Sequence, residues 1–233
     1  MTWLILAAAV VPALLLLWFV YSKDFNPEPK NLVFKGFFFG ALSVFASLMF
    51  STPMVVSGVI THNPASFTDA VLLSFLGAAI PEESAKLLML WLLLRRCKEF
   101  DERYDGLVYA AAVGLGFACL ENILYVVEAG NGWLETSVVR ALFAVPGHFS
   151  FAIVMGYYYS KSHFEWNKTP VSDKVKMWAY PVLLHGAYDT MALSAGLGYL
   201  WSGLMSVALL VFCFFLFRHT RRRILTEAQN NRQ

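Results

Sequence analysis

Apolar side chains fill seven long runs of the chain, and short polar segments separate one run from the next. A helix that crosses a bilayer needs about 20 consecutive, mainly apolar residues. The pattern therefore predicts an all-α, polytopic transmembrane helical bundle with about seven spans. The predicted spans cover residues 3–21, 34–57, 67–94, 106–129, 135–160, 177–196 and 199–217.

The composition also indicates a membrane protein. Hydrophobic residues make up 58% of the 233 residues and charged residues only 15%, whereas soluble domains contain about 25% charged residues. The seven spans leave no room for a separate soluble domain. We therefore expect a single transmembrane domain over residues 1–217, a basic cytoplasmic tail over residues 218–233, and a multi-pass position in the cell membrane with lipid on all sides.

The basic residues orient the predicted spans. Of the 18 lysines and arginines, 16 lie in the segments 22–35, 95–105, 161–176 and 218–232, and the other two are Lys86 and Arg140. These four segments fall on the same side of a bundle with seven spans, and basic segments face the cytoplasm. The N-terminus is therefore expected outside and the C-terminus in the cytoplasm. We interpret the arginine run of the tail as an anchor at the membrane and not as a nucleic-acid site.

The third run contains charged residues at its centre. Glu82, Glu83 and Lys86 follow Pro81, and an ionisable group at the centre of a membrane helix costs about 2.5–3.5 kcal/mol. Spacings of three and four residues let one of the glutamates pair with Lys86. An ion pair without chemistry would leave the other carboxylate without a partner, so we interpret the three residues as the base of a functional site. We also expect a kink or break at Pro81, because proline removes a backbone donor.

The fourth run carries a second acidic position. Glu121 and Asn122 lie near its middle, and Phe117, Glu121 and Tyr125 share one helix face at a spacing of four residues. A buried structural carboxyl that is hydrogen-bonded to the tyrosine is the alternative to a functional residue. The residues of this run alone do not decide between the two.

Histidines interrupt the fifth and sixth runs. His148 follows Pro146 and a glycine, which indicates a local break in the helix. His185 and Asp189 share a face, so the aspartate can orient the imidazole, or the pair can form a structural ion pair. Arg140, near the outer end of the fifth run, is expected to extend outward to the membrane surface.

The polar residues of these four runs are expected at a similar depth. At a rise of about 1.5 Å per residue, Glu83, Glu121, His148 and Asp189 lie roughly 18–22 Å from the cytoplasmic ends of their spans. In a hydrocarbon core about 30 Å thick they form one layer near the midplane. The other three runs contribute no ionisable group to it, so the layer indicates a common site.

The chemistry that suits this layer is the activation of water. The layer offers carboxylates, two histidines and a lysine, and a glutamate can act as general base. The residues alone leave open whether that base is Glu82 or Glu83. Histidines with a carboxylate can hold a divalent metal ion that activates water, and Lys86 or a histidine can stabilise an oxyanion. A proton-coupled transporter or channel is the alternative, because such residues also form proton relays; the halves of the chain show no internal repeat of the kind common in transporters.

These residues and their order resemble the PrsW family of intramembrane proteases, which shares a superfamily with the CAAX prenyl endopeptidases. The resemblance covers nearly the whole chain, including the early KDFNPEPK and the DERYDGLVYA before the fourth run. Its motifs here are Glu82-Glu83-x-x-Lys86, Phe117-x-x-x-Glu121-Asn122-x-x-Tyr125, His148 followed by Gly156, and His185-x-x-x-Asp189.

The resemblance implies roles for these residues. Glu82 is the expected base and Glu83 the partner of Lys86. A divalent metal, expected to be zinc, and a metal-free glutamate mechanism both stay open. The remaining assignments are Glu121, His148 and His185 around the water or metal, Asp189 behind them, and Asn122 and Tyr125 as supporting residues.

The resemblance also implies a substrate. The family is expected to cleave a single-span anti-sigma factor near the outer membrane face, as the first (site-1) step of a stress-response cascade. A CAAX-type endopeptidase with another substrate would use the same chemistry and is the remaining alternative.

Overall fold

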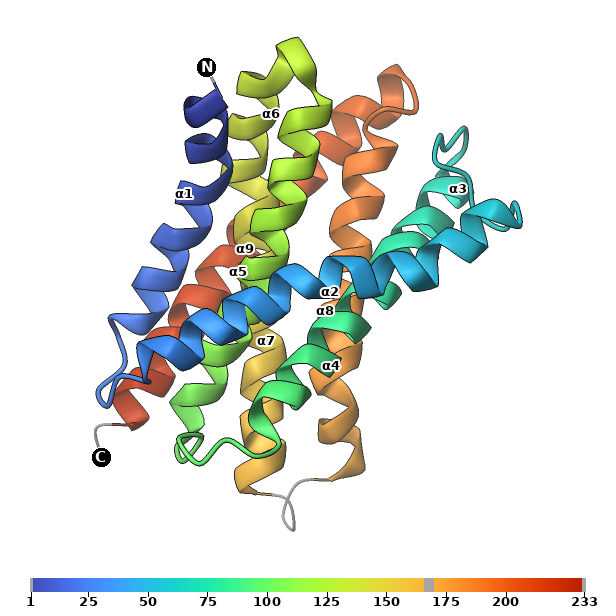
Figure 1. Cartoon of the computed structure of the whole chain (residues 1–233). Coiled ribbons are helices and arrows are strands. Elements are labelled where there is room, and N and C mark those ends of the chain that lie inside the picture. The colour runs from blue at the N-terminus through green and yellow to red at the C-terminus, as the bar shows by residue number, and fades with distance from the viewer. Residues whose placement is uncertain (1, 166–169, 232–233) are drawn as a thin grey trace.

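The computed structural model describes residues 2–165 and 170–231, which form a bundle of helices without a strand (Figure 1). Seven continuous helical rods coincide with the seven predicted spans, so the all-α bundle is confirmed. Two rods combine several elements that follow one another without interruption. The elements are α1 (Thr2–Tyr21), α2 (Lys30–Val56), α3 (Phe67–Leu72), η1 (Leu73–Ala79), α4 (Ile80–Leu94), α5 (Arg103–Glu128), η2 (Gly130–Gly132), α6 (Trp133–Val139), η3 (Arg140–Ala144), α7 (Val145–Phe164), α8 (Val171–Ser194) and α9 (Tyr199–Asn230).

The outer surface of the bundle suits a membrane. Four stretches, Lys30–Val56, Arg103–Glu128, Gly130–Phe164 and Trp201–Asn230, are long and apolar enough to cross it, and Leu6–Tyr21 is a shorter apolar helix. The two rods outside this set, α3–α4 and α8, carry titratable residues of the predicted site, which lower their hydropathy. Large apolar side chains such as those of Trp18, Phe34 and Phe214 are exposed, as expected where lipid replaces water.

Helix α5 is the central element of the bundle. It packs against α1, α2 and α7 (Figure 1). A methyl group added at Gly116 would overlap the backbone carbonyl of Phe37, and one added at Gly40 would overlap that of Val113. Small residues let membrane helices approach this closely, so these glycines allow the backbones of α2 and α5 to pack against each other.

Helix α9 is longer than the apolar run that predicts it. It continues beyond residue 217 to Asn230, through most of the segment expected to be a basic tail. Ile224 is 0% exposed and Ala228 7%, and both pack into the cluster around Tyr104 and Leu17. The extension has an apolar face despite its arginines, and burial of that face stabilises the helix.

The two predicted proline breaks are wide helical turns. A π-helical segment, η1, ends directly before Ile80 and Pro81, and a second one, η3, ends directly before Val145 and Pro146. Proline lacks the N–H of an α-helical bond and clashes with the carbonyl four residues back. A π turn skips that bond, so both helices continue through their prolines, and both prolines lie beside residues of the predicted site.

Candidate active site

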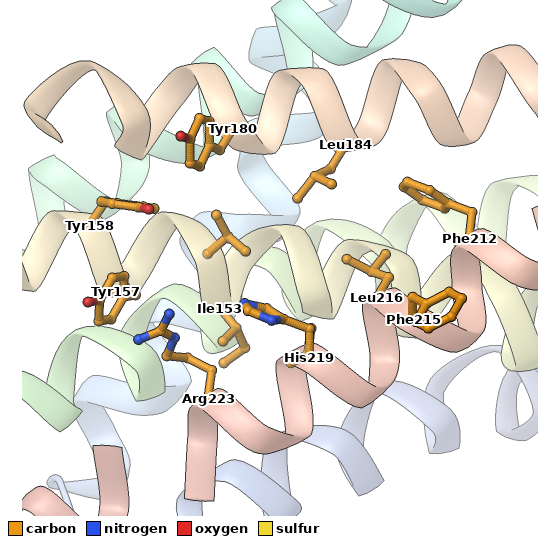
Figure 2. A pocket seen from close by; sticks show the side chains of 12 residues that line it. Ile153, Tyr157, Tyr158, Tyr180, Leu184, Phe212, Phe215, Leu216, His219 and Arg223 are labelled. Atoms are coloured by element: carbon orange, nitrogen blue, oxygen red, sulfur yellow. The ribbon is translucent and has the colours of Figure 1, made fainter. Parts of the chain in front are cut away.

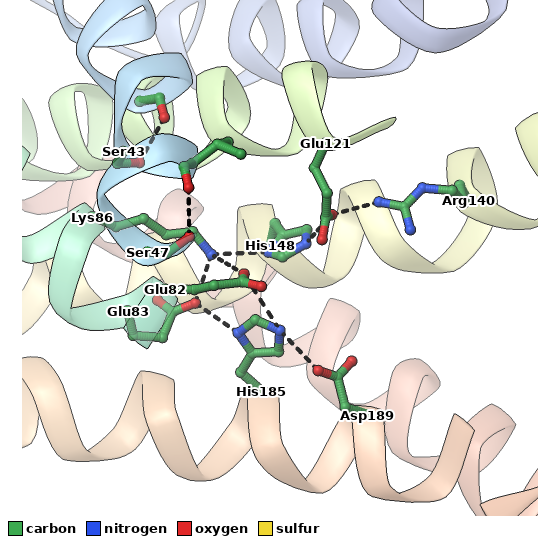
Figure 3. A network of polar contacts seen from close by, with 12 residues as sticks. Ser43, Ser47, Glu82, Glu83, Lys86, Glu121, Arg140, His148, His185 and Asp189 are labelled. Carbon is green, nitrogen blue, oxygen red and sulfur yellow. Dashed lines mark hydrogen bonds and ion pairs between the residues drawn. The ribbon is translucent and has the colours of Figure 1, made fainter. Parts of the chain in front are cut away.

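Lys86 lies at the centre of a buried cluster of titratable side chains (Figure 3). Its Nζ is 2.8 Å from Oε1 of Glu83 and 3.3 Å from Oε2 of Glu82. It is also 3.1 Å from Nδ1 of His148 on α7. The lysine thus contacts both glutamates and not one alone, because residues three and four positions back flank it on the same helix face.

On one side of this centre, His148 joins Glu121 of α5. His148 Nε2 is 2.9 Å from Glu121 Oε2, and the same carboxylate pairs with Arg140 at 2.5 Å. Arg140 Nε donates to the side-chain oxygen of Asn122, whose amide nitrogen donates to the carbonyl of Ala9. The expectation that Arg140 extends outward is therefore wrong: it points inward and supplies the positive charge beside Glu121.

On the other side, His185 of α8 bridges two acidic groups. Its Nδ1 is 2.9 Å from Glu83 Oε1, and its Nε2 is 3.2 Å from Asp189 Oδ2 and 3.8 Å from Glu82 Oε2 (Figure 3). The rings of His148 and His185 lie 5.0 Å apart. A continuous chain of contacts therefore runs from Arg140 to Asp189 and includes all seven residues expected to be catalytic.

Aromatic side chains line the cluster. Lys86 Nζ lies 3.8 Å from the ring centroid of Phe117, and the ring of Phe151 stacks on His185 at 5.0 Å. These contacts exclude water and lower the local dielectric, which strengthens the polar contacts inside. Sequence reasoning did not single out Phe151, although it lies one turn beyond His148.

The hydrogen bonds give the two histidines different protonation patterns. An ammonium group only donates, so Nδ1 of His148 accepts from Lys86, and Nε2 carries the proton that it donates to Glu121. Both nitrogens of His185 face carboxylate oxygens, and that arrangement suits a ring that donates from both. His148 is thus a neutral imidazole, whereas His185 has the surroundings of an imidazolium.

The two π segments explain why distant residues reach the cluster. Arg140 precedes His148 by eight residues, which in an ideal helix leaves a mismatch of about 80° in direction. One extra residue in a π turn removes most of that mismatch. Phe75 likewise precedes Glu83 by eight residues, and its ring fills the space beside Gly186, next to His185. No regular helical spacing reveals these partners.

The donors at the centre fit a metal ion. One ligand atom from each of Glu82, Glu83, His148 and His185 lies within 4.8 Å of the others. Imidazole nitrogens and carboxylate oxygens are ligands that zinc takes, and Oε2 of Glu83 is buried without a hydrogen-bond donor. This convergent group contains the paired glutamates and not Glu121, which the resemblance places among the ligands.

Tyr125 lies at the edge of the cluster. Its ring is 4.1 Å from the guanidinium carbon of Arg140, and 49% of the residue is exposed. It supports the arginine by a cation–π contact. A hydrogen bond from the tyrosine to Glu121, the structural alternative for that carboxyl, is not among the contacts of the described residues.

A separate pocket lies between α7, α8 and α9 (Figure 2). It has a volume of about 540 Å³ and mainly apolar walls, and its polar lining residues include His219 and Arg223 of α9 (Figure 2). Leu184, next to His185 in the chain, also lines it. None of the clustered residues lines this pocket, so the chemistry belongs to the enclosed cluster.

Fold and site together define a class: a polytopic membrane protein with a buried acid–base and metal-compatible centre between its helices. A family model described as "PrsW family intramembrane metalloprotease" matches residues 28–217. The chain therefore belongs to the PrsW family of intramembrane metalloproteases, and it is a peptidase. This decides against the transporter or channel that the residues alone left open.

Curated relatives agree with the family model. The chain is 36% identical to "Protease PrsW" of Geobacillus kaustophilus over 209 residues, which cover 88% of this chain and 87% of the relative. It is 37% identical to "Protease PrsW" of Bacillus subtilis over 79% of this chain and 81% of the relative. It is 32% identical to "Protease PrsW" of Clostridioides difficile over 90% and 85%. No solved structure gives a significant match.

Proposed function

We propose that the protein hydrolyses a peptide bond of a single-span membrane protein, with Glu82 as the general base. The observation that carries this assignment is the difference between the paired glutamates. The side chain of Glu82 is 13% exposed and that of Glu83 0%. A base must reach the water that it deprotonates, and Glu82 is the more accessible of the two.

Glu83 has a positioning role in this proposal. Its Oε1 contacts both Lys86 and His185, so it holds these two groups on either side of Glu82. Lys86 is the nearest positive charge to Glu82 and would stabilise negative charge on the peptide oxygen as water adds. Preorganised charge of this kind in a water-poor site is a large contribution to catalysis.

A divalent metal ion, proposed to be zinc, fits the same centre. His148 and His185 with a glutamate of the pair would hold it, and Glu121 and Asp189 would orient the two imidazoles from behind. A bound zinc ion supplies Lewis acidity that lowers the pKa of water. Lys86 contacts three of the four donors, so it would have to withdraw from His148 for that nitrogen to become a ligand. His185 would have to release the proton that faces Glu83, because a ligating imidazole nitrogen must be unprotonated.

For the substrate, we propose an anti-sigma factor with one membrane span, cleaved as the first step of a stress response. The support is the family resemblance and its motifs. A CAAX-type endopeptidase activity would use the same cluster on another substrate. The two differ in one measurable respect: the anti-sigma factor presents a peptide bond near the outer membrane face, and a prenylated protein presents one at the cytoplasmic face.

The test uses purified protein in proteoliposomes with single-span model substrates. Glu82→Gln is expected to reduce cleavage by about 10²–10⁴-fold, the contribution of a general base, while the variant keeps the elution profile and helicity of the wild type. Glu135→Gln, which alters an exposed glutamate of α6, is the matched control and should cleave normally. Cleavage retained in Glu82→Gln would remove Glu82 as the base.

A further inference from the structure

A second group of carboxylates lies far from the active site, where the α1–α2 loop meets the start of α5. One carboxylate oxygen from each of Asp24, Glu102 and Asp105 lies within 4.8 Å of the others. Asp105 is 16 residues before Glu121 on α5, so the two sites are separated by roughly 24 Å along that helix. In Figure 1 this group is at the end of the bundle where α1 ends and α5 begins.

Each of these three residues has a buried oxygen that no donor satisfies. Oδ2 of Asp105 accepts the backbone N–H groups of Asp101 and Glu102, but no N–H or hydroxyl group reaches its Oδ1, although the residue is 0% exposed and its carboxyl lies against that of Glu28. Oδ2 of Asp24 and Oε1 of Glu102 are buried without a donor as well. An unsatisfied buried polar atom costs about 1–3 kcal/mol, and more when it is charged.

Among the residues that the structure describes, no basic side chain pairs with the group. Within the described residues, no ion pair involves Asp24, Glu102 or Asp105, and nearby Arg103 is paired with Glu165. A fourth carboxylate, that of Glu28, adds negative charge: it is 4% exposed, accepts a hydrogen bond from Tyr109 and lies against Asp105. Close carboxylates without a counter-charge repel one another, so this group requires a bound cation or shared protons. A bound cation would contact the unpaired oxygens of all three residues at once, so it is the better candidate.

We propose that Asp24, Glu102 and Asp105 bind a hard divalent cation, Mg²⁺ or Ca²⁺, which fastens the α1–α2 loop to the start of α5. All three donors are carboxylate oxygens, the ligands that these cations prefer. The donor set contains no histidine or cysteine, which separates this site from the zinc-compatible active site. Its role is structural: it fixes the end of the central helix that carries Glu121 further along.

Terbium luminescence tests this proposal directly on the full chain in detergent, after treatment with a chelator. Terbium takes the oxygen ligands of Ca²⁺, and Tyr109 next to Glu28 can sensitise its emission. We expect saturable emission that Ca²⁺ or Mg²⁺ displaces, and a cation-dependent rise in Tm, because a ligand that binds only the folded state stabilises it.

Two isosteric variants locate the site. Asp24→Asn and Glu102→Gln leave the cap made by Asp105 intact, and each is expected to weaken terbium binding at least tenfold and to abolish the rise in Tm. Glu135→Gln should bind terbium as the wild type does. Glu82→Gln should bind it equally well, which separates this site from the active-site cluster.

Terbium emission that is unchanged in both carboxylate variants, or absent from the wild type, would overturn the proposal. So would a rise in the Tm of Asp24→Asn at neutral pH without any response to cations, because shared protons would then neutralise the group.

Discussion

Glu82 and Glu83 are neighbours in the chain, but their surroundings differ. Glu83 is enclosed and contacts Lys86 at 2.8 Å and His185 at 2.9 Å. Glu82 makes longer contacts with the same two groups, 3.3 Å and 3.8 Å, and its side chain keeps 13% of its surface accessible. One carboxylate is thus held as part of the framework, while the other is available for a reacting water.

This difference predicts that two isosteric variants lower the stability by different amounts. Glu83→Gln leaves the charge of buried Lys86 with a weaker partner, and breaking a buried pair costs about 3–5 kcal/mol. Glu82→Gln removes the longer and more accessible contact, leaves Lys86 paired with Glu83, and should therefore cost less. Denaturant unfolding of both variants in the same detergent checks the order. Equal stability of the two would contradict the framework role of Glu83.

Arg140 and Glu121 are expected to act as one unit. Arg140→Gln leaves the carboxylate of Glu121 with His148, whereas Glu121→Gln leaves the arginine with Asn122 and the ring of Tyr125. Each single variant should therefore lower both Tm and cleavage, and the double variant should be no worse than the more damaging single one. Strictly additive losses would show that the two residues contribute independently.

At the scale of the element, the π segments η1 and η3 determine which residues reach the site. The pairing of Glu83 with Lys86 and of His185 with Asp189 could be predicted from the sequence, because spacings of three and four place residues on one face of a regular helix. The inward position of Arg140 could not be predicted, because it depends on an extra residue in the turn between Arg140 and His148.

The carboxylate group of Asp24 and Glu102 could not be predicted from the sequence for another reason. The two residues are far apart in sequence and meet only through the packing of α1 on α5.

The contact between η1 and α8 predicts a glycine-specific effect. A methyl group at Gly186 would overlap the ring of Phe75, so Gly186→Ala should move η1 away from His185 and lower cleavage at least tenfold. Phe75→Leu, which provides a smaller side chain, should restore part of the activity in the double variant. Gly203→Ala on α9, where no atom lies within 4 Å of the added carbon, is the matched control and should cleave normally. A fully active Gly186→Ala would contradict a packing role for this contact.

At the scale of the whole molecule, the bundle packs its helices so that side chains from four helical rods meet in one cluster. Hydropathy was sufficient to predict the seven rods, because long apolar runs leave few alternatives in a membrane. It could not predict that α9 extends to Asn230, since the apolar face of that extension contains few residues, such as Ile224 and Ala228. The common depth of the polar residues indicated one site, and the packing of α5 against α7 and of α4 and α7 against α8 brings their side chains into contact.

An experimental density map of the protein in a lipid nanodisc, at a resolution that shows side chains, tests the convergence of these groups most directly. The account predicts density for Glu82, Glu83, His148 and His185 around one point, with Lys86 or a metal ion at that point and Arg140 against Glu121. Side chains of Glu82 and His185 that point away from each other, too far apart to share a water molecule, would contradict it.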